Sequence, residues 1–157
     1  MNKISLILAL FISNVSLSAG ITSDSSSKID DSDQIKILYQ KAEKYIEEDN
    51  FKRSLKVLKS LIKREELSGF RADIYNLLGY SYRKIEKPNL DKSFAAYMMA
   101  LELDPEHVGA HEYLGELYLM RDQKDKALLM LEKIEQLAGS NNEEYMDLKK
   151  AIEEYQS

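Results

Sequence analysis

The strongest constraint on the fold of this chain is a spacing of ring and small residues that occurs three times. In the middle copy, Tyr75, Leu78, Gly79 and Tyr82 follow one another at steps of three, one and three. This spacing places all four side chains on one face of an α-helix. Because Gly79 has no Cβ, a second helix can approach this face closely. The spacing therefore predicts helices that pack in pairs.

The second helix of the middle pair is predicted from a similar spacing further along the chain. Ser93, Tyr97 and Ala100 stand at steps of four and three, so they also share one helical face. Pro105 follows shortly afterwards and is expected to stop this helix, because proline lacks a backbone N–H and its ring clashes with the preceding turn.

The same two helices are recognisable before and after the middle copy. In the first helix, a small residue is followed three positions later by tyrosine, and the three examples are Ala42 with Tyr45, Gly79 with Tyr82, and Gly115 with Tyr118. Leu114 matches Leu78, and the second helix aligns Ser54, Ser93 and Ala127. The interval from tyrosine to this last position is nine, eleven and nine residues. Two extra residues are therefore expected in a turn near Pro88, where an insertion costs little.

This pattern resembles the tetratricopeptide repeat, whose signature is Trp-x2-Leu-Gly-x2-Tyr, then Ala-x3-Phe, then Pro. The resemblance implies an all-α fold, an α-solenoid of three helix pairs at about residues 35–68, 72–105 and 108–139 of a domain spanning 34–138. Residues 141–156 are expected to form a capping helix, with Leu148 and Ile152 facing inward and Glu144 and Asp147 on a polar outer face.

The amino-terminal segment has the features of an export signal. Lys3 precedes an apolar run over residues 4–12, and small, polar residues follow up to Gly20. We expect residues 1–19 to be a signal peptide, removed between Ala19 and Ile21, and the mature protein to be periplasmic or secreted. An uncleaved anchor or a buried first helix is the alternative. Residues 20–33 are rich in serine and aspartate and are expected to form a disordered spacer.

Composition excludes several classes of function. The chain has no cysteine, so disulfides, thiolate metal sites and cysteine catalysis are excluded. The net charge of −5 disfavours nucleic acid as a partner. Beyond residue 12 no apolar run approaches eighteen residues, so no membrane span is expected. No catalytic elbow or phosphate loop is present, and we expect neither an enzyme nor a cofactor.

Two histidines and a set of methionines raise the question of a metal site. His107 and His111 lie four residues apart on one helical face, but the residues around them match no zinc motif. We therefore expect no metal, and we expect His111 to fill the ring position that Tyr75 fills in the preceding copy. The methionines, including Met98, Met99, Met120 and Met130, are expected at core or inter-helix positions.

The first helix of each pair leaves a second face, which the resemblance places on the concave surface of the solenoid. We name this face the concave stripe and expect it to bind a partner; its residues are Tyr39, Glu43, Asp73, Asn76, Tyr80, Arg83, Lys84, Glu112 and Glu116. Tyr39 and Tyr80 are expected to be exposed anchors, and Arg83 is expected to lie off the packing face. Opposite charges along the stripe are expected to form weak internal pairs.

Three hypotheses of function follow. The first is a non-catalytic, exported module that binds a protein or peptide segment in the concave groove. The second is a structural subunit of a cell-envelope assembly, joined through the convex face or the last helix. The third is a carrier of a metal or small ligand.

Overall fold

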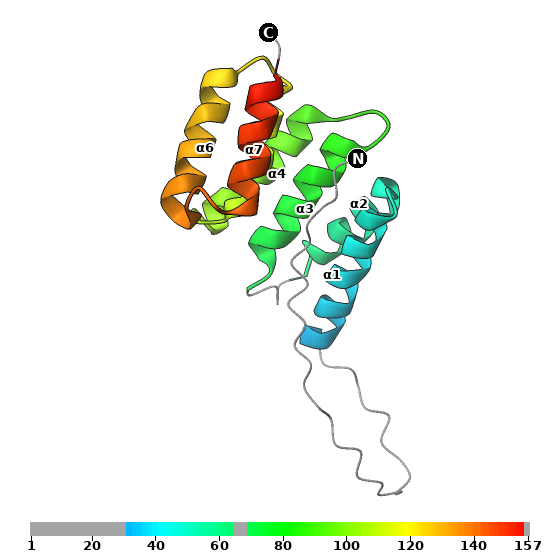
Figure 1. The fold of residues 1–157 in the computed structure, drawn as a ribbon. Helices are drawn as coiled ribbons and strands as arrows, with labels where there is room; N and C mark the ends of the chain where they lie inside the picture. Colours follow the sequence, from blue (N-terminus) through cyan, green and yellow to red (C-terminus); the bar gives the residue numbers. More distant parts are fainter. Residues whose placement is uncertain (1–30, 65–68, 156–157) are drawn as a thin grey trace, which may run out of the picture.

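The computed structural model describes residues 31–64 and 69–155 of the 157-residue chain. These residues form α1 (Asp31–Glu47), α2 (Phe51–Leu61), α3 (Arg71–Lys84), α4 (Leu90–Leu103), α5 (Val108–Leu119), α6 (Lys124–Ala138) and α7 (Glu143–Glu154). The helices follow one another from α1 and α2 at one end to α6 and α7 at the other (Figure 1). Each packs on the next, and the first helices of successive pairs also touch. The predicted solenoid of three helix pairs with a capping helix is confirmed.

The first helix begins earlier than the sequence suggested. Residues 31–33, the end of the expected disordered spacer, form the first turn of α1. Asp31 and Asp33 favour this because carboxylates stabilise the positive end of a helix dipole. Buried Ile35 then anchors the turn to the core. Residues 1–30, which include the expected signal peptide, lie outside the described residues.

The turns inside the three pairs are built alike. In each pair, the backbone N–H of the residue that follows the turn donates to the carbonyl of the signature tyrosine. The N–O distances are 2.7 Å from Asn50 to Tyr45, 2.9 Å from Asn89 to Tyr82, and 2.9 Å from Gln123 to Tyr118. The middle turn contains the two additional residues and closes on the same hydrogen bond. The predicted insertion near Pro88 is therefore confirmed.

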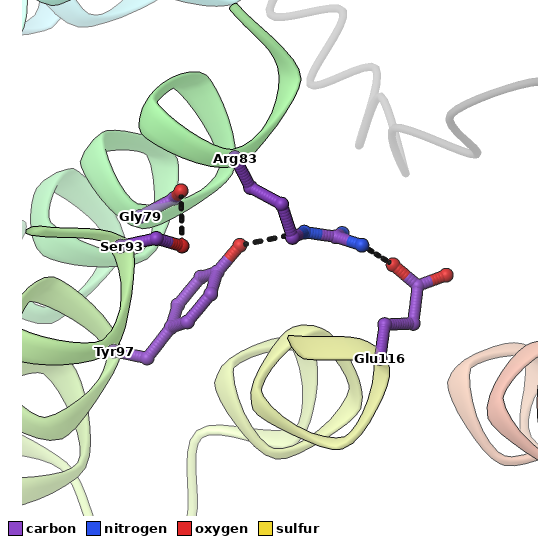
Figure 2. A network of polar contacts seen from close by, with 5 residues as sticks. All are labelled: Gly79, Arg83, Ser93, Tyr97 and Glu116. Atoms are coloured by element: carbon purple, nitrogen blue, oxygen red, sulfur yellow. Dashed lines mark hydrogen bonds and ion pairs between the residues drawn. The ribbon is translucent and has the colours of Figure 1, made fainter. Parts of the chain in front are cut away.

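Gly79 is where α3 and α4 come closest. A Cβ at this position would lie 2.5 Å from Cδ1 of Tyr97, which no real Cβ tolerates. The hydroxyl of Ser93 donates a 2.8 Å hydrogen bond to the Gly79 carbonyl at the same crossing (Figure 2). Ser93 and Tyr97 are fully buried, so the predicted packing face of this pair is confirmed.

Gly115 has a different neighbour from Gly79. A Cβ here would lie 2.6 Å from Cδ2 of Leu148, which belongs to α7 and not to the paired helix α6. Leu148 is fully buried and Ile152 nearly so. The capping helix is thus inserted against α5 as the first helix of a further pair would be.

The outer faces of α4 and α6 carry exposed apolar side chains. Met98 and Met99 on α4 and Leu129 on α6 are exposed, the last to 58%. The expectation that the methionines occupy the core is wrong for Met98, Met99 and Met120, whereas Met130 packs partly buried against the core. Among the described helices, none has both the length and the apolar character needed to cross a bilayer.

Candidate functional site

At the amino-terminal end of the concave stripe, Tyr39 is half-buried. Its ring packs against Phe70 with the centroids 5.6 Å apart, and its hydroxyl hydrogen-bonds to Glu43. Burial, with the nearby charges of Glu43 and Asp73, raises the pKa of Tyr39. Burial also raises the pKa of Glu43, which the bond to Tyr39 opposes. Tyr39 is therefore a partly covered residue with its polar tip engaged.

Tyr80 is not the exposed anchor that the sequence suggested. Only 7% of it is exposed, because α5 packs over α3 at this point. Its ring lies 4.9 Å from that of Tyr113 on α5 and 6.1 Å from that of Phe51 on α2, measured between centroids. Burial raises the pKa of Tyr80 to about 12, against the opposing effect of Arg83.

Arg83 is also buried, which contradicts its expected place off the packing face. It is 6% exposed and forms an ion pair with Glu116 of α5. Its Nε donates to the hydroxyl of Tyr97 at 3.3 Å (Figure 2). The guanidinium carbon also lies 5.5 Å from the ring centroids of both Tyr80 and Tyr113, a distance at which cation–π attraction operates. The expectation of internal pairing holds for Arg83 and Glu116, but this pair is buried rather than weak and exposed.

Two polar atoms on this part of α3 lack partners. The Oδ1 atom of Asn76 and the Nη2 atom of Arg83 are buried without a hydrogen-bond partner among the described residues. Leaving such a group unpaired costs about 1–3 kcal/mol. Because both atoms are buried, they add a cost to folding and offer no contact to a partner.

The remaining charged residues of α3 stay accessible. Lys84 is exposed, with its Nζ 5.6 Å from the centroid of the Tyr80 ring. Asp73 lies at the opposite end of the helix, where its Oδ1 is 3.2 Å from Nε2 of His107. The concave stripe therefore has accessible charges at both ends of α3 and a closed aromatic centre.

Both histidines have local structural roles. Nδ1 of His107 accepts from the backbone N–H of Ala110 at 3.2 Å and so caps α5. His111 is buried in the expected ring position, and its Nε2 lies 2.9 Å from the Pro105 carbonyl. Burial lowers the pKa of His111, which favours the neutral ring. In the described part of the chain no group of three potential metal ligands is arranged around a common point.

Glu112 occupies the most unusual electrostatic position of the stripe. It is 7% exposed, and burial raises its pKa to about 9, assisted by the charges of Glu116, Asp147 and Glu144 and opposed by Arg83. Glu144 and Asp147 were expected on the polar outer face of the capping helix; Asp147 is exposed, and the charges of both act on Glu112 across the α5–α7 contact. Sequence reasoning also missed Tyr113. If α7 had been aligned with the first helices of the three pairs, Glu144 and Asp147 would have been expected beside α5.

The comparisons with known proteins agree with the repeat pattern. Residues 96–129, from α4 through α5 into α6, match the tetratricopeptide repeat family model. The chain is 30% identical over 92 residues to tetratricopeptide repeat protein 37 of Xenopus laevis, covering 59% of this chain and 6% of that protein. It is 33% identical over 84 residues to the uncharacterized protein ycf37 of Porphyra purpurea, covering 52% of this chain and 46% of that protein. It therefore spans less than half the length of either relative.

A solved structure extends the likeness to most of the fold. The crystal structure of MamA is similar with a TM-score of 0.62 over 78% of this chain and 69% of that chain, at 21% sequence identity. At this identity the likeness concerns the fold alone. Residues 96–129 thus match the tetratricopeptide repeat family, and the helical solenoid as a whole is similar in fold to MamA.

Proposed function

We propose that this chain is a non-catalytic module that holds a segment of another protein along its concave stripe. The repeat fold suggests protein–protein interaction, because solenoids present extended concave surfaces for this purpose. The bound segment lies across α1, α3, α5 and α7. Its side chains meet the accessible charges at the two ends of α3.

The observation that carries this proposal is the accessible charge at both ends of α3, Asp73 at one end and Lys84 at the other. Charged side chains of the partner pair with these two residues on either side of the closed centre that contains Tyr80 and Arg83. Exposed ion pairs each contribute up to about 1 kcal/mol. Asp73→Asn should therefore weaken partner binding by up to about 1 kcal/mol.

We propose further that the protein acts outside the cytoplasm, because residues 1–19 have the composition of an export signal. Partner capture is therefore best attempted in the periplasmic or secreted fraction of the cells that make the protein.

Site-specific crosslinking tests the surface directly. The natural chain has no cysteine, so one introduced cysteine can carry a photo-crosslinker at a chosen position. Lys84→Cys places the crosslinker beside the concave stripe, and Leu129→Cys places it on the outer face of α6; both residues are exposed. A partner crosslinked through position 84 and not through position 129 supports the proposal. The reverse result contradicts it.

A second candidate, a structural subunit joined through the convex face, is favoured by one observation. Exposed apolar side chains lie on the outer faces of α4 and α6, including Met98, Leu103 and Leu129. Exposed apolar surface of this kind often marks an interaction site. Crosslinks through position 129 alone would establish this candidate, and crosslinks at neither position would count against both.

A further inference from the structure

Four carboxyl side chains act on one another where α5 meets α7. Glu112 and Glu116 come from α5, and Glu144 and Asp147 come from α7. One cation, Arg83, also acts on Glu112, but it forms its ion pair with Glu116. Negative groups therefore outnumber positive ones in this cluster, which we name the acidic subsite.

The acidic subsite contains carboxyl groups without partners. Glu112 is more than nine-tenths buried, yet its carboxyl group makes no hydrogen bond and no ion pair with the described residues. The Oε2 atom of Glu144 is likewise buried without a hydrogen-bond partner. Buried carboxyl groups are normally hydrogen-bonded or paired with a cation, because removal from water is costly. Two carboxyl groups without partners, on two helices that pack together, indicate a missing positive group.

We infer that the acidic subsite binds one lysine side chain of the captured segment. This inference rests on the proposed function, because the subsite includes Glu112 and Glu116 of the concave stripe. A lysine ammonium offers three donors on a compact charge, which suits several converging carboxyl oxygens. A bound metal ion fits less well, since no group of three ligands in the described residues is arranged for one.

Binding of lysine here should be coupled to release of a proton. The pKa of Glu112, raised by burial to about 9, keeps this side chain protonated in the free protein near neutral pH. An arriving ammonium favours the carboxylate, so the proton leaves as the lysine binds. Affinity should then rise up to about tenfold per pH unit below pH 9. The groups that face Glu112 are Tyr113 and Glu116 of α5, Arg83 of α3, and Glu144 and Asp147 of α7.

The test uses a small probe, N-acetyl-lysine methylamide, titrated into the isotope-labelled protein and followed by NMR. The uncharged isostere N-acetyl-norleucine methylamide is the control ligand. We expect shifts centred on residues 112–116 and 144–147 with the lysine probe only, and tighter binding at pH 8 than at pH 6. Glu112→Gln should weaken binding about tenfold at pH 8 and remove its pH dependence. Glu102→Gln, an exposed residue on α4, should change nothing.

Equal responses to the lysine and norleucine probes, or unchanged binding in Glu112→Gln, would overturn the inference. Circular dichroism checks that Glu112→Gln is folded, and Asp147→Asn at the exposed edge provides a second variant, expected to weaken binding in the same direction. Should crosslinking through position 84 succeed while the probe fails, only the subsite is wrong. Should the probe bind without such crosslinks, the concave partner site is wrong.

Discussion

Arg83 on α3 and Glu116 on α5 form an ion pair inside the solenoid, and the Arg83 guanidinium lies beside the rings of Tyr80 and Tyr113. The pair links two successive repeats, since α3 opens the second helix pair and α5 opens the third. Tyr97 completes the arrangement by accepting from Arg83 Nε at 3.3 Å. The concave stripe is therefore organised around a rigid, charged centre rather than a solvated row of side chains.

Removing one member of this pair should destabilise the protein strongly. Arg83→Met leaves Glu116 without its cation, and breaking a buried pair typically costs about 3–5 kcal/mol. Because Glu116 keeps 18% of its side chain exposed, we expect a value near the lower limit of that range. Urea unfolding measures the change.

The double variant Arg83→Met with Glu116→Leu should recover much of that loss, because apolar replacements avoid the cost of burying charge. Lys52→Met, which breaks the exposed 3.7 Å pair with Glu86, is the control and should cost no more than about 1 kcal/mol. Similar losses for Arg83→Met and Lys52→Met would contradict the burial of the Arg83–Glu116 pair.

Gly79→Ala should lower stability although alanine favours helices. The new Cβ would meet the ring of Tyr97, which is fully buried and cannot move aside. Overpacking of this kind costs about 1–3 kcal/mol. Gly109→Ala is the matched control. The atom nearest to its new Cβ would be the Asn76 amide nitrogen at 3.3 Å, so only a small change in stability is expected. Thermal unfolding of both variants measures the difference, and equal melting temperatures would show that the α3–α4 crossing is looser than described.

Stability should fall with rising pH because of Glu112. The pKa of Glu112 is about 9 in the folded protein against a usual value of 4.5. Between pH 4.5 and pH 9 the folded chain therefore holds a proton on Glu112 that the unfolded chain releases. The contribution of Glu112 to stability is complete below about pH 4.5 and is lost progressively up to pH 9. The slope from this group reaches at most about 1.4 kcal/mol per pH unit. Urea unfolding at pH 6 and pH 8 should show a shallower slope for Glu112→Gln than for the natural chain.

The mature protein should begin between Ala19 and Ile21. This follows from the charged start, the apolar run and the small residues before that point. Intact-mass measurement of protein recovered from the periplasm or the medium decides it. A chain still beginning at Met1 in that fraction would disprove cleavage, and protein confined to the cytoplasm would disprove export.

The linear sequence was sufficient to predict the repeat. The spacing of Gly79, Tyr82 and Ser93 depends only on helical periodicity and turn length, which are local properties of the chain. Hence the helix pairs and the two-residue insertion near Pro88 were predicted, and the close contact at Gly79 was recognised from the absence of a side chain.

Only the tertiary structure decided which polar residues are buried. Tyr80 and Arg83 were expected off the packing face of their own helix pair, in a solvated position. The neighbouring pair covers them, because α5 brings Tyr113 and Glu116 over α3. Glu112 is covered in the same way by α7. A periodic pattern within one helix determines which residues share a face, whereas the rotation between successive pairs determines which of those faces remain in water.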